Sequence, residues 1–225
     1  VRIEDAVPAR DADLAKVTGL AIDPTGNAVL LALPAFNAIR VINVGTQSYT
    51  LAGRAFAPGT IGTLAAPEFA DLRGVVLQTL SREVFFIAGP VVYRLNSAGQ
   101  ITPFAGGGTP QTGNGDGGLA RMARLVNPRG LAFDTSNNLL IAEGGNPRSS
   151  NPDGAVRRVN GNSTINTVAG GLDFPTGVTA APNGNIYVAL GNVQQILGIA
   201  PNGARTVVAG NAATLACEPN SNPTC

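Results

Sequence analysis

Histidine is absent from the 225 residues of this chain. Its absence excludes the Ser-His-Asp arrangement, imidazole zinc sites, haem ligation by imidazole and the commonest general base near neutral pH. Both cysteines, Cys217 and Cys225, lie at the C-terminal end. A thiolate metal centre in the body of the chain is therefore excluded as well.

Charge and long apolar runs are also scarce. Charged residues make up 13% of the chain and the formal net charge is +1, which gives no general field for nucleic acid or an anionic membrane. No apolar stretch approaches the roughly 20 residues of a spanning helix. The opening VRIEDAV is neither a signal peptide nor an initiator methionine, so we expect a mature or trimmed chain. We predict no nucleic-acid partner and no membrane span.

Helical periodicity is missing too, and aromatic residues make up only 5% of the chain. What the chain does have is 29 glycines, 16 prolines and 44% hydrophobic residues, a composition that fits many short strands joined by turns around a sizeable core. We therefore predict a single domain that is nearly all β.

A unit of four short strands recurs along the chain. Its clearest copy is 127–171, in which LAF, LLIAE, AVRRV and TINTVAG are separated by turns or a long loop. Three further copies span 17–53, 69–107 and 174–211. The glycines that open the first strands are spaced by 55, 56 and 47 residues, and they are Gly19, Gly74, Gly130 and Gly177. Four strands repeated at this length predict a β-propeller.

The third copy carries the residues of a known repeat. The pattern of Pro-x-Gly, an Asp-led turn, an Arg-Val pair and a closing Ala-Gly resembles the NHL-repeat β-propellers, and the matching residues are Pro128, Gly130, Asp134, Asn138, Arg158, Val159, Val168 and Gly170. The preceding GDGGLARMARLVNP resembles the inter-blade segment of bacterial members. The first copy lacks the proline, the second lacks the turn, and the fourth has Ala181 in place of the aspartate. The resemblance implies the fold, but not a function, because the fold hosts binding modules, lyases and lactonases.

The organisation expected from these copies is an arm at 1–16, a propeller at 17–211 and a tail at 212–225. VRI at the start could add a strand to the last blade, or the arm could be loose. Members of the resembled family commonly have about six blades, so four copies leave closure open. Either they form a small closed ring, or they form an arc completed by another chain or by sequence missing here, with self-association through exposed blade edges.

The tail sequence ACEPNSNPTC can turn back on itself. We predict a Cys217–Cys225 disulfide and hence an extracytoplasmic location, periplasmic, secreted or at the cell surface. Two alternatives stay open: both thiols are unpaired, or Cys225 is the start of a longer motif.

Long connections nominate one face of the predicted propeller. Strands alternate in direction within a blade, so connections between blades and from second to third strands emerge together. The long connections 54–70, 107–126 and 144–154 are therefore expected on one face, with tight turns on the other. Neutral surface insertion is the alternative.

Two sets of residues are candidates for binding. Arginine suits bidentate capture of carboxylate or phosphate, which gives the partner-binding candidates Arg54, Asp116, Arg121, Arg124 and Arg148, with Arg129 at the start of an inner strand. Carboxylates in flexible, carbonyl-rich segments could hold calcium, which gives the metal candidates Asp116, Asp134 and Asp153. The alternative is that these are ordinary turn residues and solvated arginines.

We therefore predict a non-catalytic extracytoplasmic propeller that presents its long-loop face to a protein or carbohydrate partner, with no obligatory cofactor. One alternative is a calcium-dependent hydrolase or lyase acting on a lactone, ester or sugar acid. The apolar inner strands GLAI, GVVL, GLAF and GVTA weaken that alternative. The other is a structural subunit of a surface or filamentous assembly.

Overall fold

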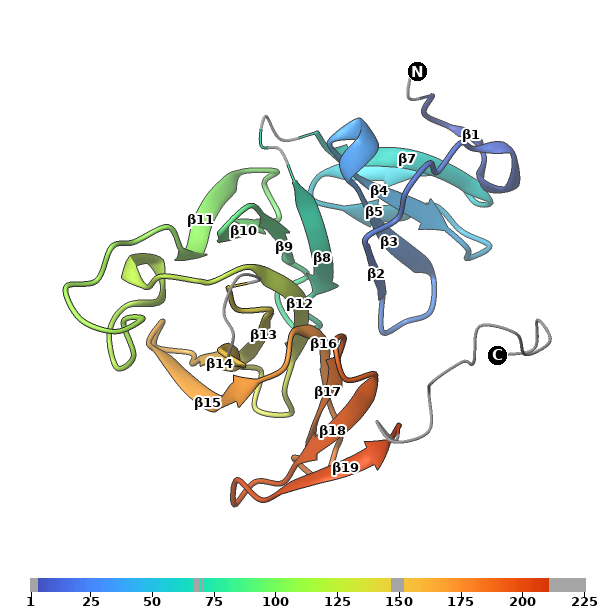
Figure 1. Cartoon of the computed structure of the whole chain (residues 1–225). Helices are drawn as coiled ribbons and strands as arrows, with labels where there is room; N and C mark the ends of the chain where they lie inside the picture. The colour runs from blue at the N-terminus through green and yellow to red at the C-terminus, as the bar shows by residue number, and fades with distance from the viewer. Residues whose placement is uncertain (1–3, 67–68, 70, 147–151, 211–225) are drawn as a thin grey trace.

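The computed structural model describes residues 4–66, 69, 71–146 and 152–210 (Figure 1). This part of the chain is nearly all β, with four-stranded antiparallel sheets arranged as a four-bladed propeller. The fold class predicted from the repeat is therefore confirmed. Three single turns of 3-10 helix interrupt the strands: η1 (Ala9–Asp11), η2 (Pro34–Phe36) and η3 (Ala120–Met122). No described helix is long and apolar enough to cross a membrane.

Each blade is a meander whose first strand lies innermost. Blade 1 contains β2 (Gly19–Ile22), β3 (Ala28–Leu33), β4 (Ala38–Asn43) and β7 (Thr60–Ala65). Blade 2 contains β8 (Leu72–Leu77), β9 (Val84–Ala88), β10 (Val91–Leu95) and β11 (Ile101–Gly106). Blade 3 contains β12 (Pro128–Phe133), β13 (Leu139–Glu143), β14 (Gly154–Val159) and β15 (Ile165–Leu172). Blade 4 contains β16 (Pro175–Ala180), β17 (Ile186–Leu190), β18 (Gln195–Ile199) and β19 (Arg205–Ala209).

A glycine lies at or near the start of each inner strand, because the inner strands meet backbone to backbone. A Cβ on Gly19 would lie 2.9 Å from the Cα of Gly74, and one on Gly130 would lie 2.8 Å from the Cα of Gly177. No side chain fits at such a distance. The recurrence of glycine at this position of each repeat is therefore a consequence of the close packing of the inner strands.

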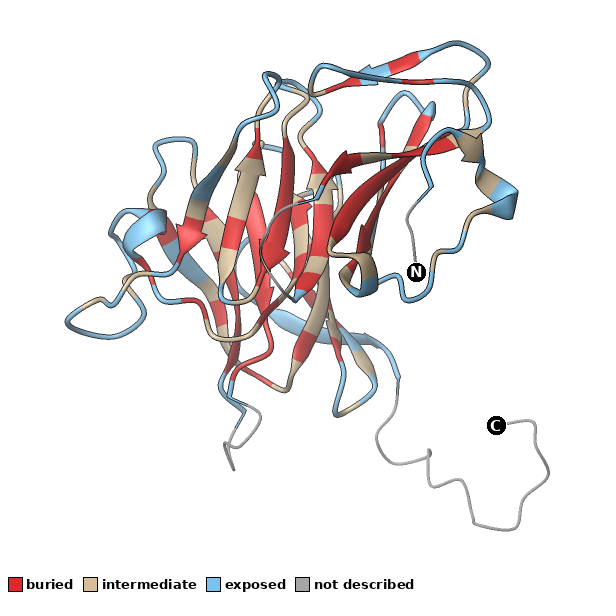
Figure 2. Ribbon diagram, turned by 90° about the horizontal axis from the view of Figure 1, so that it is seen from above, coloured by how far each residue is buried: buried red, intermediate tan, exposed pale blue. Residues whose placement is uncertain are grey.

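Apolar side chains between successive blades form the core. Separate clusters join blade 1 to blade 2, blade 2 to blade 3, and blade 3 to blade 4, and Figure 2 shows the buried residues concentrated in the strands. The inner strands likewise pack in order, β2 on β8, β8 on β12, and β12 on β16. In the described part, β16 and β2 have no comparable contact. The four blades thus form an arc, open between blade 4 and blade 1.

The fourth strand of blade 1 differs from the sequence interpretation. The first copy was expected to end in SYTLAG (Ser48–Gly53) as its fourth strand, but β4 pairs with β7 instead. The segment Tyr49–Leu51 is β5, which turns through Ala52 and Gly53, both at positive φ, into β6 (Arg54–Phe56). This hairpin is inserted between the third and fourth strands, so its Ala-Gly is a two-residue turn rather than the end of a blade.

The N-terminal arm does add a strand, but to the first blade. The short strand β1 (Val7–Pro8) pairs with Thr60 and Ile61 on the outer edge of β7. The VRI segment, for which pairing with the last blade and a loose arm were both left open, lies outside the described residues, as does the predicted Cys217–Cys225 disulfide.

Candidate functional site

The inner strands all begin at the same end of the propeller, and the residue before each repeat glycine lies there. These residues are Thr18, Arg73, Arg129 and Thr176, and together they line a cavity of about 450 Å³. Lys16, Pro34, Asp71 and Leu72 complete its lining. We call this the mouth cavity. It receives residues from all four blades, whereas the other candidate sites draw on one or two.

Positive charge dominates the mouth cavity. Its lining contains three cations, Lys16, Arg73 and Arg129, against one carboxylate, Asp71. Arg73 neutralises that carboxylate by donating from Nε and Nη2 to its two oxygens at 3.0 and 2.9 Å. Its Nη1 also donates to Asn127 Oδ1 at 2.7 Å. Arg73 is thus held in place, and because both oxygens of Asp71 accept from it, the other two cations have no carboxylate hydrogen-bonded to them within the described residues.

Arg129 is the unusual group in the mouth cavity. It makes no hydrogen bond or ion pair within the described residues, and its Nε is buried without a hydrogen-bond partner. Its guanidinium stacks over the ring of Phe174 at 4.2 Å. Burial lowers its pKa, and the nearby Arg73 lowers it further against the opposing effect of Asp71. A partly desolvated cation without a partner is a ready site for an anion.

The hydroxyl groups of the two threonines in the mouth cavity already donate hydrogen bonds to backbone carbonyls. Thr18 Oγ1 donates to Leu72 O at 2.9 Å, and Thr176 Oγ1 donates to Ala189 O at 3.3 Å. Donors for a ligand therefore come chiefly from Arg129 and from the exposed Lys16, which has no ion pair among the described residues. The geometry suits anion binding.

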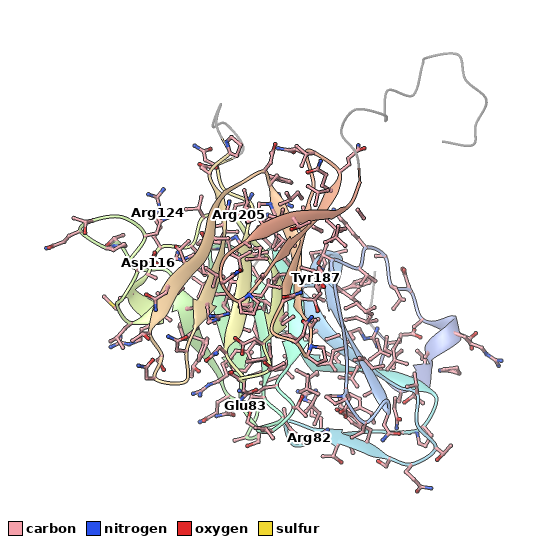
Figure 3. All side chains as sticks on the ribbon, turned by 90° about the horizontal axis from the view of Figure 1, so that it is seen from below. Arg82, Glu83, Asp116, Arg124, Tyr187 and Arg205 are labelled. Atoms are coloured by element: carbon pink, nitrogen blue, oxygen red, sulfur yellow. The ribbon has the colours of Figure 1, made fainter. Side chains whose placement is uncertain are left out.

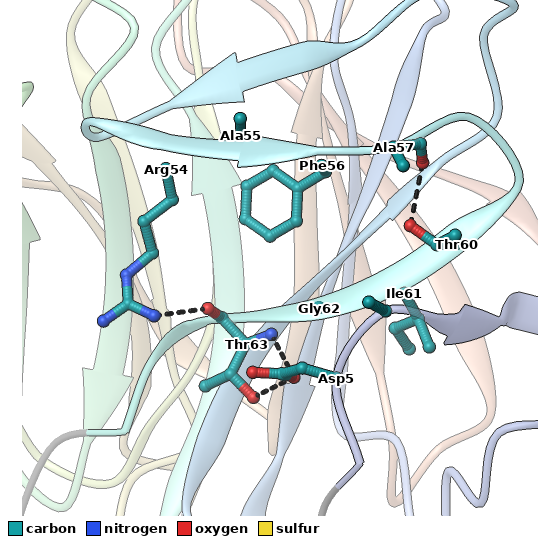
Figure 4. A pocket seen from close by; sticks show the side chains of 10 residues that line it. Asp5, Arg54, Ala55, Phe56, Ala57, Thr60, Ile61, Gly62 and Thr63 are labelled. Carbon is teal, nitrogen blue, oxygen red and sulfur yellow. Dashed lines mark hydrogen bonds between the residues drawn. The ribbon is translucent and has the colours of Figure 1, made fainter.

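Arg54, predicted for the long-loop face, is elsewhere. It lies on β6, in the connection between third and fourth strands, which emerges with the tight turns. Tyr49 of the same hairpin accepts from Arg82 Nη2 at 2.8 Å, and Arg82 lies in the tight turn between β8 and β9. Arg54 donates to Thr63 O at 3.1 Å beside a separate cavity of about 300 Å³ (Figure 4). The structure thus separates Arg54 from Arg121 and Arg124.

Asp116 and Arg124 do lie together, but their contacts are structural (Figure 3). Arg157, fully buried on β14, donates to Asp116 Oδ1 at 2.6 Å, to the carbonyl of Arg124 at 3.4 Å and to Glu143 Oε1 at 3.2 Å. Burial raises the pKa of Glu143 to about 7, against the lowering effect of Arg157. The cluster fastens the 107–126 connection to blade 3. Arg121 is exposed on η3, and Arg148 lies outside the described residues.

The three predicted calcium ligands occupy separate turns. Asp134 Oδ1 accepts the backbone N–H groups of Ser136 and Asn138 at 3.0 and 2.9 Å, as a turn aspartate does. Asp153 Oδ1 accepts the N–H of Asn146 at 2.9 Å. No group of three or more metal-ligating side chains gathers among the residues described. Calcium binding at any of these turns stays a prediction.

Sequence reasoning missed Arg73, Lys16 and Phe174 and mentioned Arg129 only in passing. The signal was present in the alignment of the four copies: the residue before the repeat glycine is Thr, Arg, Arg and Thr in turn. In a propeller the inner strands begin around the centre, so this position lies there in every blade. Two arginines at such a position predict an anion site.

No family model and no curated protein matches this chain. Among solved structures, a streptogramin B lyase is similar with a TM-score of 0.56 and 14% identity, covering 92% of this chain and 58% of that one. A protein of unknown function from Bacteroides thetaiotaomicron is similar with a TM-score of 0.61 and 16% identity, covering 80% and 46%. The chain thus spans less than two thirds of either. These likenesses show the β-propeller fold, whereas membership of the NHL-repeat family is not shown.

Proposed function

We propose that this protein is a non-catalytic binding propeller that acts outside the cytoplasm and captures a carboxylate of a protein or carbohydrate partner in its mouth cavity. The observation that carries the proposal is Arg129, a half-buried cation without a hydrogen-bond partner among the described residues. A planar guanidinium matches a carboxylate in geometry and charge.

The size and charge of the mouth cavity support the same function. Its volume of about 450 Å³ falls within the range of roughly 300–1,000 Å³ that is typical of small-molecule sites. The stacking of Arg129 on Phe174 limits the motion of the guanidinium, so less conformational freedom is lost when an anion binds.

Catalysis has less support at this site. Asp71 is the one carboxylate in the described lining, and both its oxygens accept from Arg73, so it is poorly placed to act as a base. The calcium-dependent alternative would need acidic ligands that converge, whereas Asp116, Asp134 and Asp153 lie on different turns. The activity in the name of the similar lyase belongs to that protein.

Calorimetric titration with matched ligands tests the proposal. The probes are a galacturonate oligosaccharide, a glutamate-rich peptide and a neutral galactose oligosaccharide of equal length. We expect one of the two acidic probes to bind, more weakly as salt is added, and the neutral sugar not to bind. The acidic probe that binds identifies the partner as carbohydrate or protein.

Variants assign the binding to the mouth cavity. Arg129→Gln should weaken it by about tenfold or more, because a charge-assisted bond is lost. Arg121→Gln is the matched control, because it removes an exposed arginine on η3 and should leave binding unchanged. Equal binding by Arg129→Gln, or no binding of either acidic probe, would refute the proposal. Chelator in a parallel titration tests the calcium prediction.

A further inference from the structure

Blade 1 exposes apolar side chains at positions that blade 2 buries and that blades 3 and 4 keep partly buried. The residues one and three after the repeat glycine face the preceding blade. In blade 2 these are Val75 and Leu77, which are 3% and 5% exposed. In blade 1 they are Leu20 and Ile22, which are 68% and 63% exposed because no blade precedes them within the described residues. We call Leu20 and Ile22 the first end face.

Blade 4 exposes the complementary side. Residues Tyr187, Ile196 and Val208 lie on the face turned away from blade 3, and Val208 Cγ2 and the Tyr187 ring both approach Gly198. We call these three the last end face. Ile196 is 36% and Val208 57% exposed.

Blade 3 shows what normally covers these positions. Tyr187, Ile196 and Val208 correspond in register to Leu140, Val156 and Val168 of blade 3. The first two are fully buried and Val168 packs in the same cluster, in every case against blade 4. The last end face is therefore of the kind that a following blade covers.

Connecting segments fill the outer part of the space between blades. The β5–β6 hairpin does so between blades 1 and 2, and the segment containing η3 does so between blades 2 and 3. On the open side of blade 1, the arm already packs in this way through Val7, Ala9, Ala12 and Leu14. Among the described residues nothing covers the inner strand of blade 1, which is the part that a neighbouring blade contacts.

The row of inner glycines stops in the same place. Gly19, Gly74 and Gly130 each face the backbone of the next inner strand, but the nearest atom to a Cβ on Gly177 is Ala189 Cβ of its own blade, at 3.8 Å. Beside Gly177 there is space for one more inner strand. Within the described residues, the inner strand β2 has no strand packed on the side that faces a preceding blade.

We infer that blade 4 of one molecule packs on blade 1 of a second copy, the last end face against the first end face. The partner that covers each end face is a second copy of this chain, because each molecule carries both complementary faces at matching blade positions. None of the five side chains on the two faces is charged, so the contact buries no unpaired charge. Such a head-to-tail contact closes into a ring or continues as a filament.

Light scattering of the whole chain over a wide concentration range tests this. The mass should rise from the 22.7 kDa of one chain toward multiples of it. Ile22→Glu spoils the first end face, and Val208→Glu spoils the last. Each variant alone should remain a monomer, with self-association weakened by about tenfold or more. Leu80→Glu is the control: Leu80 is 82% exposed in the turn between β8 and β9, and this variant should associate like the natural chain.

A mixture of the two variants identifies the head-to-tail arrangement. The intact last end face of Ile22→Glu can dock on the intact first end face of Val208→Glu, so the mixture should give a one-to-one pair that grows no further. An association of like faces would instead leave one variant dimeric on its own. Circular dichroism of each variant checks that it is folded. A natural chain that stays monomeric throughout, or folded variants whose mixture does not pair, would overturn the inference.

Discussion

Replacing Arg157 with methionine should be among the most damaging single changes in this protein. Its side chain is fully buried and donates to two carboxylates and two carbonyls, those of Asp116, Glu143, Arg124 and Asn114. Methionine fills a similar volume but leaves these acceptors unsatisfied. Breaking a buried ion pair from one side typically costs about 3–5 kcal/mol of unfolding free energy.

The exposure of the two carboxylates determines which of them accounts for most of the lost unfolding free energy. Asp116 is about half exposed and can return to water, whereas Glu143 is 2% exposed and cannot. Most of the loss should therefore come from Glu143, and the double variant Arg157→Met/Glu143→Leu should recover a large part of it. The 107–126 connection should also become more accessible, because its anchor on blade 3 is removed.

Urea unfolding at pH 8, where Glu143 with its pKa of about 7 is mostly ionised, measures the free energies, and hydrogen exchange measures the accessibility of the connection. A loss below about 1 kcal/mol in Arg157→Met would refute the reasoning, since a surface pair contributes no more than that. A double variant less stable than Arg157→Met would show that the uncompensated carboxyl is not the source.

Two further changes test the packing and the electrostatics. Gly130→Ala should cost about 2 kcal/mol or more, because its Cβ would lie 2.8 Å from Gly177 Cα, whereas Gly161→Ala, with no atom within 4 Å, should be near neutral; thermal unfolding compares them. In the folded protein the pKa of Glu143 is raised from 4.5 to about 7, so the folded state binds a proton at this carboxyl more tightly than the unfolded state does. The stabilisation that this proton provides is fully present below about pH 4.5 and is lost as the pH rises through about 7. Between pH 4.5 and 8 the natural chain should lose about 3 kcal/mol relative to Glu143→Gln, and parallel pH profiles would contradict this.

The sequence was sufficient for the strands of blades 2, 3 and 4, because each strand there is an apolar run bounded by turn residues or by a loop. It failed at blade 1, where the Ala52-Gly53 turn of the β5–β6 hairpin mimics the Ala-Gly that closes the other copies. That error also placed Arg54 on the wrong face, since the face of a connection depends on which strands it joins.

The candidate site was harder to predict, since the partners of a charged side chain are fixed by tertiary contacts. Asp116 and Arg129 look alike in the sequence, as charged residues beside glycines. The fold gives Asp116 a buried arginine as partner and gives Arg129 none among the described residues. In the sequence, Arg129 is distinguished by its position directly before a repeat glycine. Only the propeller fold brings that position to the centre of the molecule.

The most direct test of the central claim is the nuclear magnetic resonance signal of the Arg129 guanidinium, assigned by its loss in Arg129→Gln. Addition of the acidic probe that binds should shift this signal and slow its exchange with water, while the signal of Arg121 stays unchanged. A saturating acidic probe that leaves the Arg129 signal where it was would contradict an anion site in the mouth cavity.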